Sequence, residues 1–183
     1  TTGQVTSVPR SLCVAFGVMH PRNAICGSSK KASRENYSFH TIAAVLPFEF
    51  VVIGRPVPHG NRDKVELRRW RKVVREAAIA AWPAKAPVGG LIQVTITHYY
   101  DSKNLEYGTL PDSDAIVKPV SDALNGIVYV DDYQISDFVN RRRDVNSSFR
   151  VKGMSPALAK GFCSGQEFLH LQIVEQPDPE VLE

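Results

Sequence analysis

The chain has 183 residues, a hydrophobic fraction of 43%, a charged fraction of 22% and a formal net charge of +3. These values are typical of one soluble globular domain that is large enough to bury a core without disulfides. A membrane-spanning protein is excluded, since no run approaches the ~18 apolar residues that a transmembrane helix needs. The three cysteines are widely separated and show no CxxC spacing, which favours a reducing, cytoplasmic compartment over a disulfide framework or a zinc knuckle.

Residues 1–44 show no clear hydrophobic periodicity, and they contain a polar stretch at residues 27–36 that is typical of a loop. We therefore expect these residues to form an N-terminal extension, followed by one folded domain over residues 45–183. The apolar run at residues 11–19 is too short to be read as a targeting signal, so we expect a strand or a poorly ordered arm there.

The folded part begins with a β-rich run, FEFVVIG, at residues 48–54. Because Gly and Pro follow it, the run predicts a buried strand and then a loop. A helix is expected over residues 63–82, where Asp63 can cap the start and Pro83 lies just beyond the end. The apolar residues that share one face of this helix are Trp70, Val74, Ala77, Ala78 and Ala81.

Three further segments have strand patterns. Residues 90–100 alternate between Ile or Val and Gln or Thr, so one face of this strand should be less buried than the other. The apolar run at residues 127–130, IVYV, predicts the start of another strand, and residues 134–145 should continue it or pair with it as a hairpin. A last strand is expected over residues 167–176.

A short helix is predicted over residues 113–126, with its end at the Asn125–Gly126 pair. Pro119 lies past the first turn of this helix, so we expect a distortion there. The order of helices and strands predicts an α+β fold, in which a single mixed β-sheet is covered by two helices.

Residues 111–138, PDSDAIVKPVSDALNGIVYVDDYQISDF, contain six aspartates and one lysine among apolar residues. If the segment around Asp112 and Asp114 is extended, both carboxylates leave the same face. Asp114, Lys118 and Asp122 are spaced by four residues each, which places them on one face of the predicted helix.

Asp131 and Asp132 follow that helix and the next apolar run, and this path could fold Asp132 back beside the first two carboxylates. Carboxylates that crowd together repel one another unless a cation lies between them. Mg²⁺ prefers oxygen ligands and commonly binds carboxylates together with substrate phosphates. The pattern therefore predicts a metal-dependent phosphodiesterase site, in which a lysine stabilises the charge that builds up on the phosphorus.

Each of these residues also has a structural interpretation. Asp114 could cap a helix, Asp131 could lie in a turn, and Lys118 could be an ordinary surface lysine. Asp122 is flanked by apolar residues, so we expect it to hold Lys118 or a backbone amide. We expect Asp137 to lie on the surface.

Two basic clusters lie outside the acidic stretch, and they suggest a polyanionic partner that is held at the sides of a carboxylate site. The alternative is that each cluster is a solvated face. The predicted nucleic-acid-binding residues are Arg62, Lys64, Arg68, Arg69, Arg71, Lys72, Arg141, Arg142 and Arg143.

The acidic stretch resembles the signature of the RusA-type Holliday junction resolvases, which reads roughly as D-x-D-N, then lysine, then D-A-L, then D-D-x-Q-V. The matching residues are Asp112, Asp114, Lys118, Asp122, Ala123, Leu124, Asp131, Asp132, Gln134 and Ile135. The likeness covers about residues 46–176, and the motif at 111–138 is its specific part.

The resemblance implies a RusA-like nuclease domain over residues 45–183. It implies a homodimer that binds branched DNA in recombination or repair and nicks four-way junctions symmetrically, one strand per subunit. The implied catalytic residues are Asp112, Asp114, Lys118 and Asp132, and the implied ligands of Mg²⁺ or Mn²⁺ are Asp112, Asp114 and Asp132, with Asp131 as a further ligand.

Other functions stay open. Ala115 replaces the usual Asn and Pro119 follows the lysine, so a junction-binding relative that cuts weakly or not at all is one alternative. The YVDD run at residues 129–132 resembles the catalytic turn of reverse-transcriptase palms, but the chain is too short for fingers and a thumb. A glycosyltransferase is disfavoured because no glycine-rich nucleotide-binding turn precedes the DxD motif.

Overall fold

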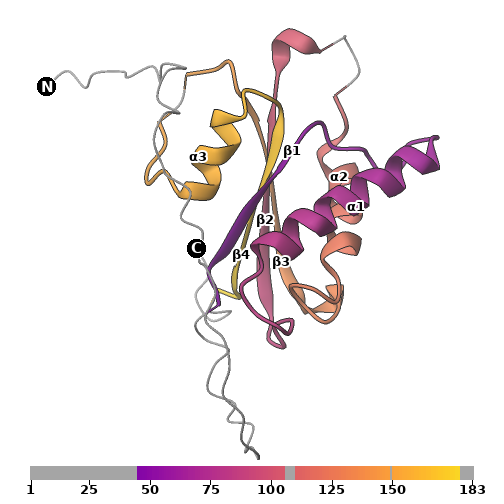
Figure 1. Cartoon of the computed structure of the whole chain (residues 1–183), viewed down its shortest axis with the longest axis vertical. Coiled ribbons are helices and arrows are strands. Elements are labelled where there is room, and N and C mark those ends of the chain that lie inside the picture. The colour runs from indigo at the N-terminus through magenta and orange to yellow at the C-terminus, as the bar shows by residue number, and fades with distance from the viewer. Residues whose placement is uncertain (1–44, 106–109, 149, 178–183) are drawn as a thin grey trace, which may run out of the picture. The chain divides into compact units, whose positions relative to one another are not determined.

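The computed structural model of the chain describes residues 45–105, 110–148 and 150–177. The expected N-terminal extension, residues 1–44, lies outside the described residues. The described chain forms one four-stranded sheet and three α-helices (Figure 1). The elements are β1 (Phe48–Ile53), α1 (Lys64–Ala81), β2 (Ile92–Tyr100), η1 (Ser102–Asn104), α2 (Ser113–Leu124), η2 (Asp132–Gln134), β3 (Ile135–Asp144), α3 (Pro156–Cys163) and β4 (Phe168–Glu175).

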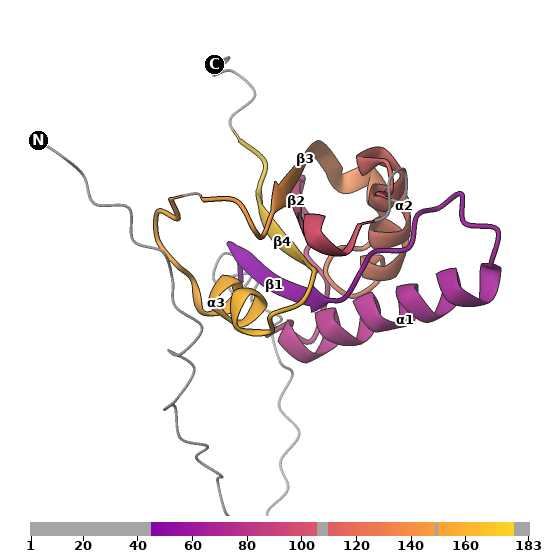
Figure 2. The same cartoon turned by 90° about the horizontal axis from the view of Figure 1, so that it is seen from above.

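The sheet is mixed, with the strand order β1-β4-β2-β3. β4 is antiparallel to both β1 and β2, whereas β2 and β3 are parallel and are joined through α2. Helices α1 and α2 cover one face of the sheet, and α3 lies on the other face (Figures 1 and 2). The α+β fold with a single mixed sheet is therefore confirmed. None of the described helices is long and apolar enough to cross a bilayer.

Alternation along the strands sends side chains to two separate apolar clusters. The larger cluster lies under α1 and α2 and includes Phe50, Ile96 and Leu171, which are all buried. The smaller cluster lies under α3 and includes Tyr99 and Phe168, whose rings stack at a centroid distance of 4.6 Å. Adjacent residues of one strand therefore point to opposite faces of the sheet, and polar residues of the sheet can contact each other only when they point to the same face.

Helix α1 begins where the sequence predicted. The Asp63 carboxylate accepts hydrogen bonds from the backbone N–H groups of Val65 and Glu66 at 2.8 and 3.1 Å. Such a cap provides an acceptor for N–H groups that have no partner within the helix. The buried face of α1 is Leu67, Trp70, Val74 and Ala78, and this spacing leaves most of its basic residues exposed.

The predicted strand at residues 127–130 is wrong. After α2 the chain turns at Gly126, which has a φ of 74°, and the N–H groups of Ile127 and Val128 both donate to the Leu124 carbonyl. Tyr129 makes only isolated bridges. The run is apolar because Ile127, Val128 and Tyr129 are buried in a turn, and an apolar run of this length does not distinguish a buried strand from other buried backbone.

Helix α3 was not anticipated. It has only 8 residues, so its sequence shows little periodicity, and its buried residues are Leu158 and Gly161. The Ser155 side chain accepts a hydrogen bond from the Leu158 N–H at 3.1 Å, and Pro156 occupies the first helical position, where it is tolerated best. This helix covers the face of the sheet that the sequence analysis left without a partner.

Candidate functional site

Asp112 and Asp114 lie at the start of α2. Asp112 is the residue that precedes the first turn, but its side chain makes no capping hydrogen bond, and Asp114 lies in the first turn itself. Both side chains are exposed. The N-terminal end of a helix carries a partial positive charge, so it favours carboxylates at these two positions.

The backbone around Asp112 is held by two side chains of β3. The side-chain amide of Asn140 donates to the carbonyl of Ser113, and the guanidinium of Arg142 donates to the carbonyl of Pro111. These contacts follow from the parallel pairing of β2 and β3. The C-terminal half of β3 lies beside the end of β2, from which the chain leads towards Asp112.

Pro119 does not interrupt α2, which runs as one helix from Ser113 to Leu124. Proline has no N–H, so it leaves the carbonyl of Ala115 without its usual donor four residues on. The backbone N–H of His59 takes that place at 2.8 Å. Pro119 therefore allows the loop that follows β1 to attach to the first turns of α2.

A groove of about 510 Å³ lies between this loop and the start of α2. Its lining includes Pro58 and Asn61 from the loop, and Asp112 and Ala115 from the region of the helix start. Arg55 also lines the groove, and it is anchored to Glu167 at 3.0 Å. One of the predicted metal ligands is thus accessible from a surface groove.

Lys118 and Asp122 form an ion pair one turn apart on α2, at 3.4 Å between Nζ and Oδ1. The other carboxylate oxygen of Asp122 accepts a hydrogen bond from Arg71 of α1 at 2.6 Å. Asp122 therefore holds Lys118, as the sequence analysis expected, and it also connects the two helices. The Lys118 side chain is 58% exposed, so its ammonium group remains accessible to a ligand.

The Asp131–Asp132 pair lies in a tight turn that leads into β3. Asp131 Oδ1 accepts a hydrogen bond from the Asp132 N–H at 2.7 Å, so Asp131 acts as the cap of η2. Gln134 is 2% exposed. Its side-chain oxygen accepts from the N–H groups of Val130 and Asp131, and its side-chain nitrogen donates to the carbonyls of Val88 and Gly90. Gln134 thereby fixes the turn and leaves Asp132 exposed.

Tyr129 links this turn to α2. Its buried hydroxyl donates to the carbonyl of Ser121 at 2.9 Å. Burial is the main reason that the pKa of this hydroxyl lies above its ordinary value, and the negative charges of Asp132 and Asp122 raise the pKa further. The charges of Asp132 and Asp122 therefore both act on the hydroxyl that joins this turn to α2.

Within the residues that the structure describes, the carboxylates of Asp112, Asp114 and Asp132 have no hydrogen-bond or ion-pair partner. As they stand, no three acidic, His or Cys side chains of the described chain are grouped closely enough to hold a metal ion. The donor set nevertheless consists of accessible carboxylate oxygens, which suits Mg²⁺. The assignment of these residues as metal ligands stays a prediction.

The basic residues of the α1 region are mostly free to meet a ligand. Arg62, Lys64, Arg68 and Arg69 are exposed. Lys72 is also exposed, and it lies 3.7 Å from Glu76. Arg71 differs, because its pairing with Asp122 leaves it only 33% exposed.

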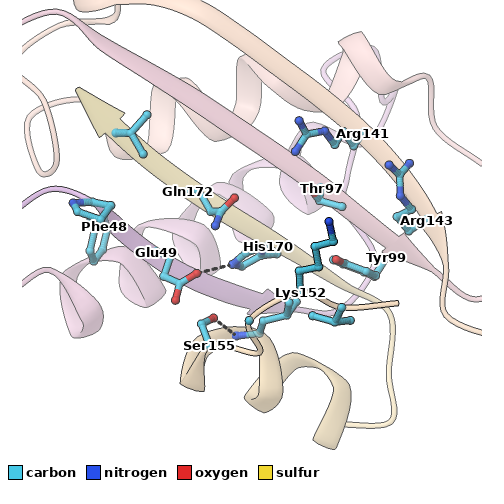
Figure 3. Close-up of a pocket in the computed structure, with 15 residues that line it drawn as sticks. Phe48, Glu49, Thr97, Tyr99, Arg141, Arg143, Lys152, Ser155, His170 and Gln172 are labelled. Carbon is cyan, nitrogen blue, oxygen red and sulfur yellow. Dashed lines mark hydrogen bonds and ion pairs between the residues drawn. The ribbon is translucent and has the colours of Figure 1, made fainter. Parts of the chain in front are cut away.

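The three consecutive arginines of β3 point to different faces. Arg141 and Arg143 are opposite Thr97 and Tyr99, and they line a groove of about 670 Å³ on the face that carries α3 (Figure 3). Lys152 also lines this groove. Arg142 points to the other face, where it holds the Pro111 carbonyl. The predicted cluster is therefore two surface arginines with a partly buried one between them.

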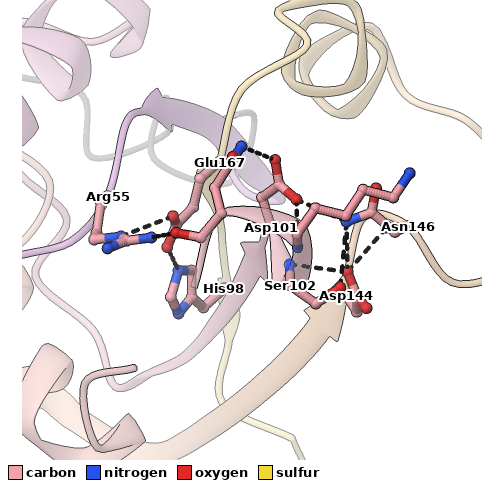
Figure 4. A network of polar contacts seen from close by, with 9 residues as sticks. Arg55, His98, Asp101, Ser102, Asp144, Asn146 and Glu167 are labelled. Atoms are coloured by element: carbon pink, nitrogen blue, oxygen red, sulfur yellow. Dashed lines mark hydrogen bonds and ion pairs between the residues drawn. The ribbon is translucent and has the colours of Figure 1, made fainter. Parts of the chain in front are cut away.

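A buried ionic network was not anticipated from the sequence. His98 Nε2 lies 2.6 Å from one carboxylate oxygen of Glu167, and Arg55 donates to the other at 3.0 Å (Figure 4). Burial alone would raise the pKa of Glu167, but the hydrogen bonds with His98 and Arg55 outweigh it and hold the pKa below its ordinary value of 4.5. In the sequence, the one sign of this network was a single His, His98, within a predicted strand.

Comparison with known proteins identifies a family. The family model described as endodeoxyribonuclease RusA matches residues 57–152, which include both Asp pairs, Lys118 and all of β3. No curated protein matches the sequence.

Proposed function

Because the chain belongs to the RusA family of endodeoxyribonucleases, we propose that it nicks four-way DNA junctions in a Mg²⁺-dependent reaction. Membership makes the chain a nuclease of the Holliday junction resolvase type that acts on branched DNA. The finer proposal is that two copies act as a dimer and make two symmetric cuts, because a two-fold dimer matches the symmetry of a four-way junction. We further propose that residues 45–183 form the nuclease domain and residues 1–44 an extension to it.

The proposal rests on a set of carboxylates within residues 57–152, the segment that the family model matches. Among the described residues these carboxylates have no hydrogen-bond or ion-pair partner. Asp112, Asp114 and Asp132 would hold the metal ion, with Asp131 beside them. Asp112 and Asp114 lie at the start of α2, Asp131 and Asp132 lie at η2, and carboxylate oxygens are ligands that Mg²⁺ prefers. When bound, Mg²⁺ or Mn²⁺ would polarise the phosphoryl oxygen and lower the pKa of a coordinated water molecule. The chain's own contribution is to hold these carboxylates on the ends of α2 and η2.

Lys118 is proposed to stabilise the negative charge that develops on the scissile phosphate. Its partner Asp122 keeps the ammonium group on the same side of α2 as Asp114. Arg71 shares the charge of Asp122 at 2.6 Å, which leaves Lys118 less strongly bound to that carboxylate. Lys118 can therefore exchange Asp122 for a phosphate oxygen.

The exposed basic residues are proposed to bind the DNA backbone. The α1 region offers Arg62, Lys64, Arg68, Arg69 and Lys72, and the groove on the opposite face offers Arg141 and Arg143. Contacts of this kind position nucleic acid without reading its sequence, and they weaken as the salt concentration rises. A junction has several arms, which suits basic surfaces on both faces of one sheet.

The test is a gel assay with labelled four-way junction, flap and linear duplex, each with Mg²⁺ and with EDTA. The proposal expects Mg²⁺-dependent nicks at symmetric positions of the junction and little cutting of the duplex. Mn²⁺ should replace Mg²⁺. Tight junction binding without any metal-dependent nicking would instead show a binding protein, which is the alternative that Ala115 and Pro119 suggest.

A further inference from the structure

Two polar side chains of β3 point into the face of the sheet that is covered by α1 and α2. Asn140 lies opposite Ile96 and Arg142 lies opposite His98 in the parallel pairing of β2 and β3. Both residues are only partly exposed. Their neighbours Arg141 and Arg143 point to the opposite face, where they line the basic groove (Figure 3).

These two side chains hold the backbone on either side of a two-residue segment. Arg142 binds the carbonyl of Pro111, and Asn140 binds the carbonyl of Ser113, so Asp112 and Ser113 lie between the two contacts. With both ends held, the backbone angles of this segment are restrained, among them the φ and ψ angles of Asp112, which are −60° and 141°. The backbone conformation sets the direction in which the Cβ atom of Asp112 leaves the chain.

Asp112 has nothing else to orient it among the described residues. Its carboxylate makes no capping hydrogen bond, and its side chain is exposed at the edge of a groove. The backbone fixes the Cα–Cβ direction of such a side chain, and its χ angles select among the rotamers that this direction allows. The contacts from β3 are therefore the part of the fold that determines where the Asp112 side chain leaves the backbone.

The remaining polar atoms of the two side chains are consistent with a positional role. Asn140 Oδ1 and Arg142 Nε are buried and have no hydrogen-bond partner in the described structure. A buried polar atom without a partner is costly. Burial alone therefore does not favour the position of either side chain. The hydrogen bonds that the two side chains do make are with the carbonyls of Pro111 and Ser113.

We propose that Asn140 and Arg142 are positioning residues for Asp112, and that they set the affinity of the carboxylate site for its divalent cation. This inference rests on the proposed function, because it takes Asp112 to be a metal ligand. It assigns to Arg142 a role different from that of Arg141 and Arg143. Those two act on DNA, whereas Arg142 acts on the chain itself.

The test uses Asn140→Ala and Arg142→Met in the full chain, since methionine keeps the length and packing of the arginine stem but has no donor. Three quantities are measured. The first is the order of the Asp112, Ser113 and Asp114 backbone from ¹⁵N relaxation without metal, the second is Mg²⁺ binding by titration calorimetry, and the third is the Mg²⁺ concentration at half-maximal nicking. A third variant, Arg142→Lys, keeps a charged donor and should recover part of the loss.

Loss of either side chain should lower the order parameters of these three residues and weaken Mg²⁺ binding about 10- to 100-fold, the usual range for residues that orient metal ligands. At saturating Mg²⁺ the value of KM for the junction should be unchanged. Two matched controls lie on the same strand. Asp137→Asn changes an exposed side chain that, among the described residues, is hydrogen-bonded to Ser136 alone, and it should leave all three measurements unchanged.

Arg141→Met is the second control, because it removes an arginine next to Arg142 on the opposite face. It should raise KM for the junction and leave both backbone order and Mg²⁺ binding as in the wild type. Wild-type backbone order and Mg²⁺ affinity in both Asn140→Ala and Arg142→Met would overturn the inference. If the wild type binds Mg²⁺ but nicks no junction, the proposed function fails, while relaxation and calorimetry still decide whether the β3 residues position Asp112.

Discussion

The backbone N–H of His59 donates to the carbonyl of Ala115 at 2.8 Å, although the two residues belong to a loop and to the helix beside it. The contact exists because Pro119, four residues after Ala115, has no N–H to offer. Pro119, where the sequence predicted a distortion of α2, therefore allows the loop after β1 to bind to the helix near Asp112. The groove lies between this loop and the start of the helix.

Replacing Pro119 with Ala should loosen the loop. The helix regains a donor that competes with His59 for the Ala115 carbonyl, but the packing of the buried ring is lost, so the free energy of unfolding should rise by less than the ~3 kcal/mol that a helix-interior proline costs. Chemical denaturation measures that change, and hydrogen exchange at the His59 amide should become faster. Unchanged exchange at His59 would show that Pro119 is not what frees the Ala115 carbonyl.

The Asp114→Asn and Asp132→Asn variants should each abolish junction cleavage and keep junction binding. An amide keeps the shape of the side chain but removes the negative charge that a metal ligand needs. Nicking of a labelled junction in Mg²⁺ and gel-shift affinity in EDTA measure the two properties. Asp137→Asn, on the exposed part of β3, is the matched control. Wild-type cutting by either active-site variant would remove that residue from the site.

The Lys118→Ala variant should slow cleavage by about 10²- to 10³-fold, as expected for the loss of one group that stabilises transition-state charge. Mg²⁺ affinity should change little, because an ammonium group is not a metal ligand. Single-turnover rates and a Mg²⁺ titration separate the two effects. Asp122→Asn, which releases Lys118 from its 3.4 Å partner, should keep more activity than Lys118→Ala. An equal loss in both variants would mean that Lys118 acts only through the ion pair.

The Arg68→Glu, Arg69→Glu double variant should weaken junction binding and flatten its dependence on salt. Both side chains are exposed on α1, and each lost phosphate contact lowers the salt slope by about one. Binding measured across a range of salt concentrations gives the slope. Arg71→Glu should behave differently. It breaks the 2.6 Å pairing with Asp122, so it should lower thermal stability as well.

Stability should depend on Glu167 at low pH. The pKa of Glu167 in the folded protein is below its ordinary value of 4.5, so the unfolded chain binds the proton more readily. The carboxylate therefore stabilises the fold fully above about pH 4.5, and this contribution is lost as the pH falls through the lower, folded pKa. Denaturation of wild type and Glu167→Gln between neutral and acidic pH should give curves that converge on acidification. A constant difference at all pH values would contradict the assignment.

Much of the fold follows from local patterns. The boundaries of α1 could be predicted from Asp63, Pro83 and an apolar face with helical spacing, because caps and periodicity act within a few residues. The strands β1, β2 and β4 could be predicted for the same reason. The family could also be recognised from the aspartates and lysine of one short stretch, and the family match confirms it.

Tertiary structure decided which polar residues meet when they are far apart in the sequence. The sequence shows three equivalent arginines at 141–143, but the alternation of β3 and its parallel pairing with β2 separate Arg142 from the other two. Arg71 looks like its basic neighbours on α1, yet it is bound to Asp122, a residue 51 positions away. Such partners depend on how helices and strands pack against each other, and no local spacing contains that information.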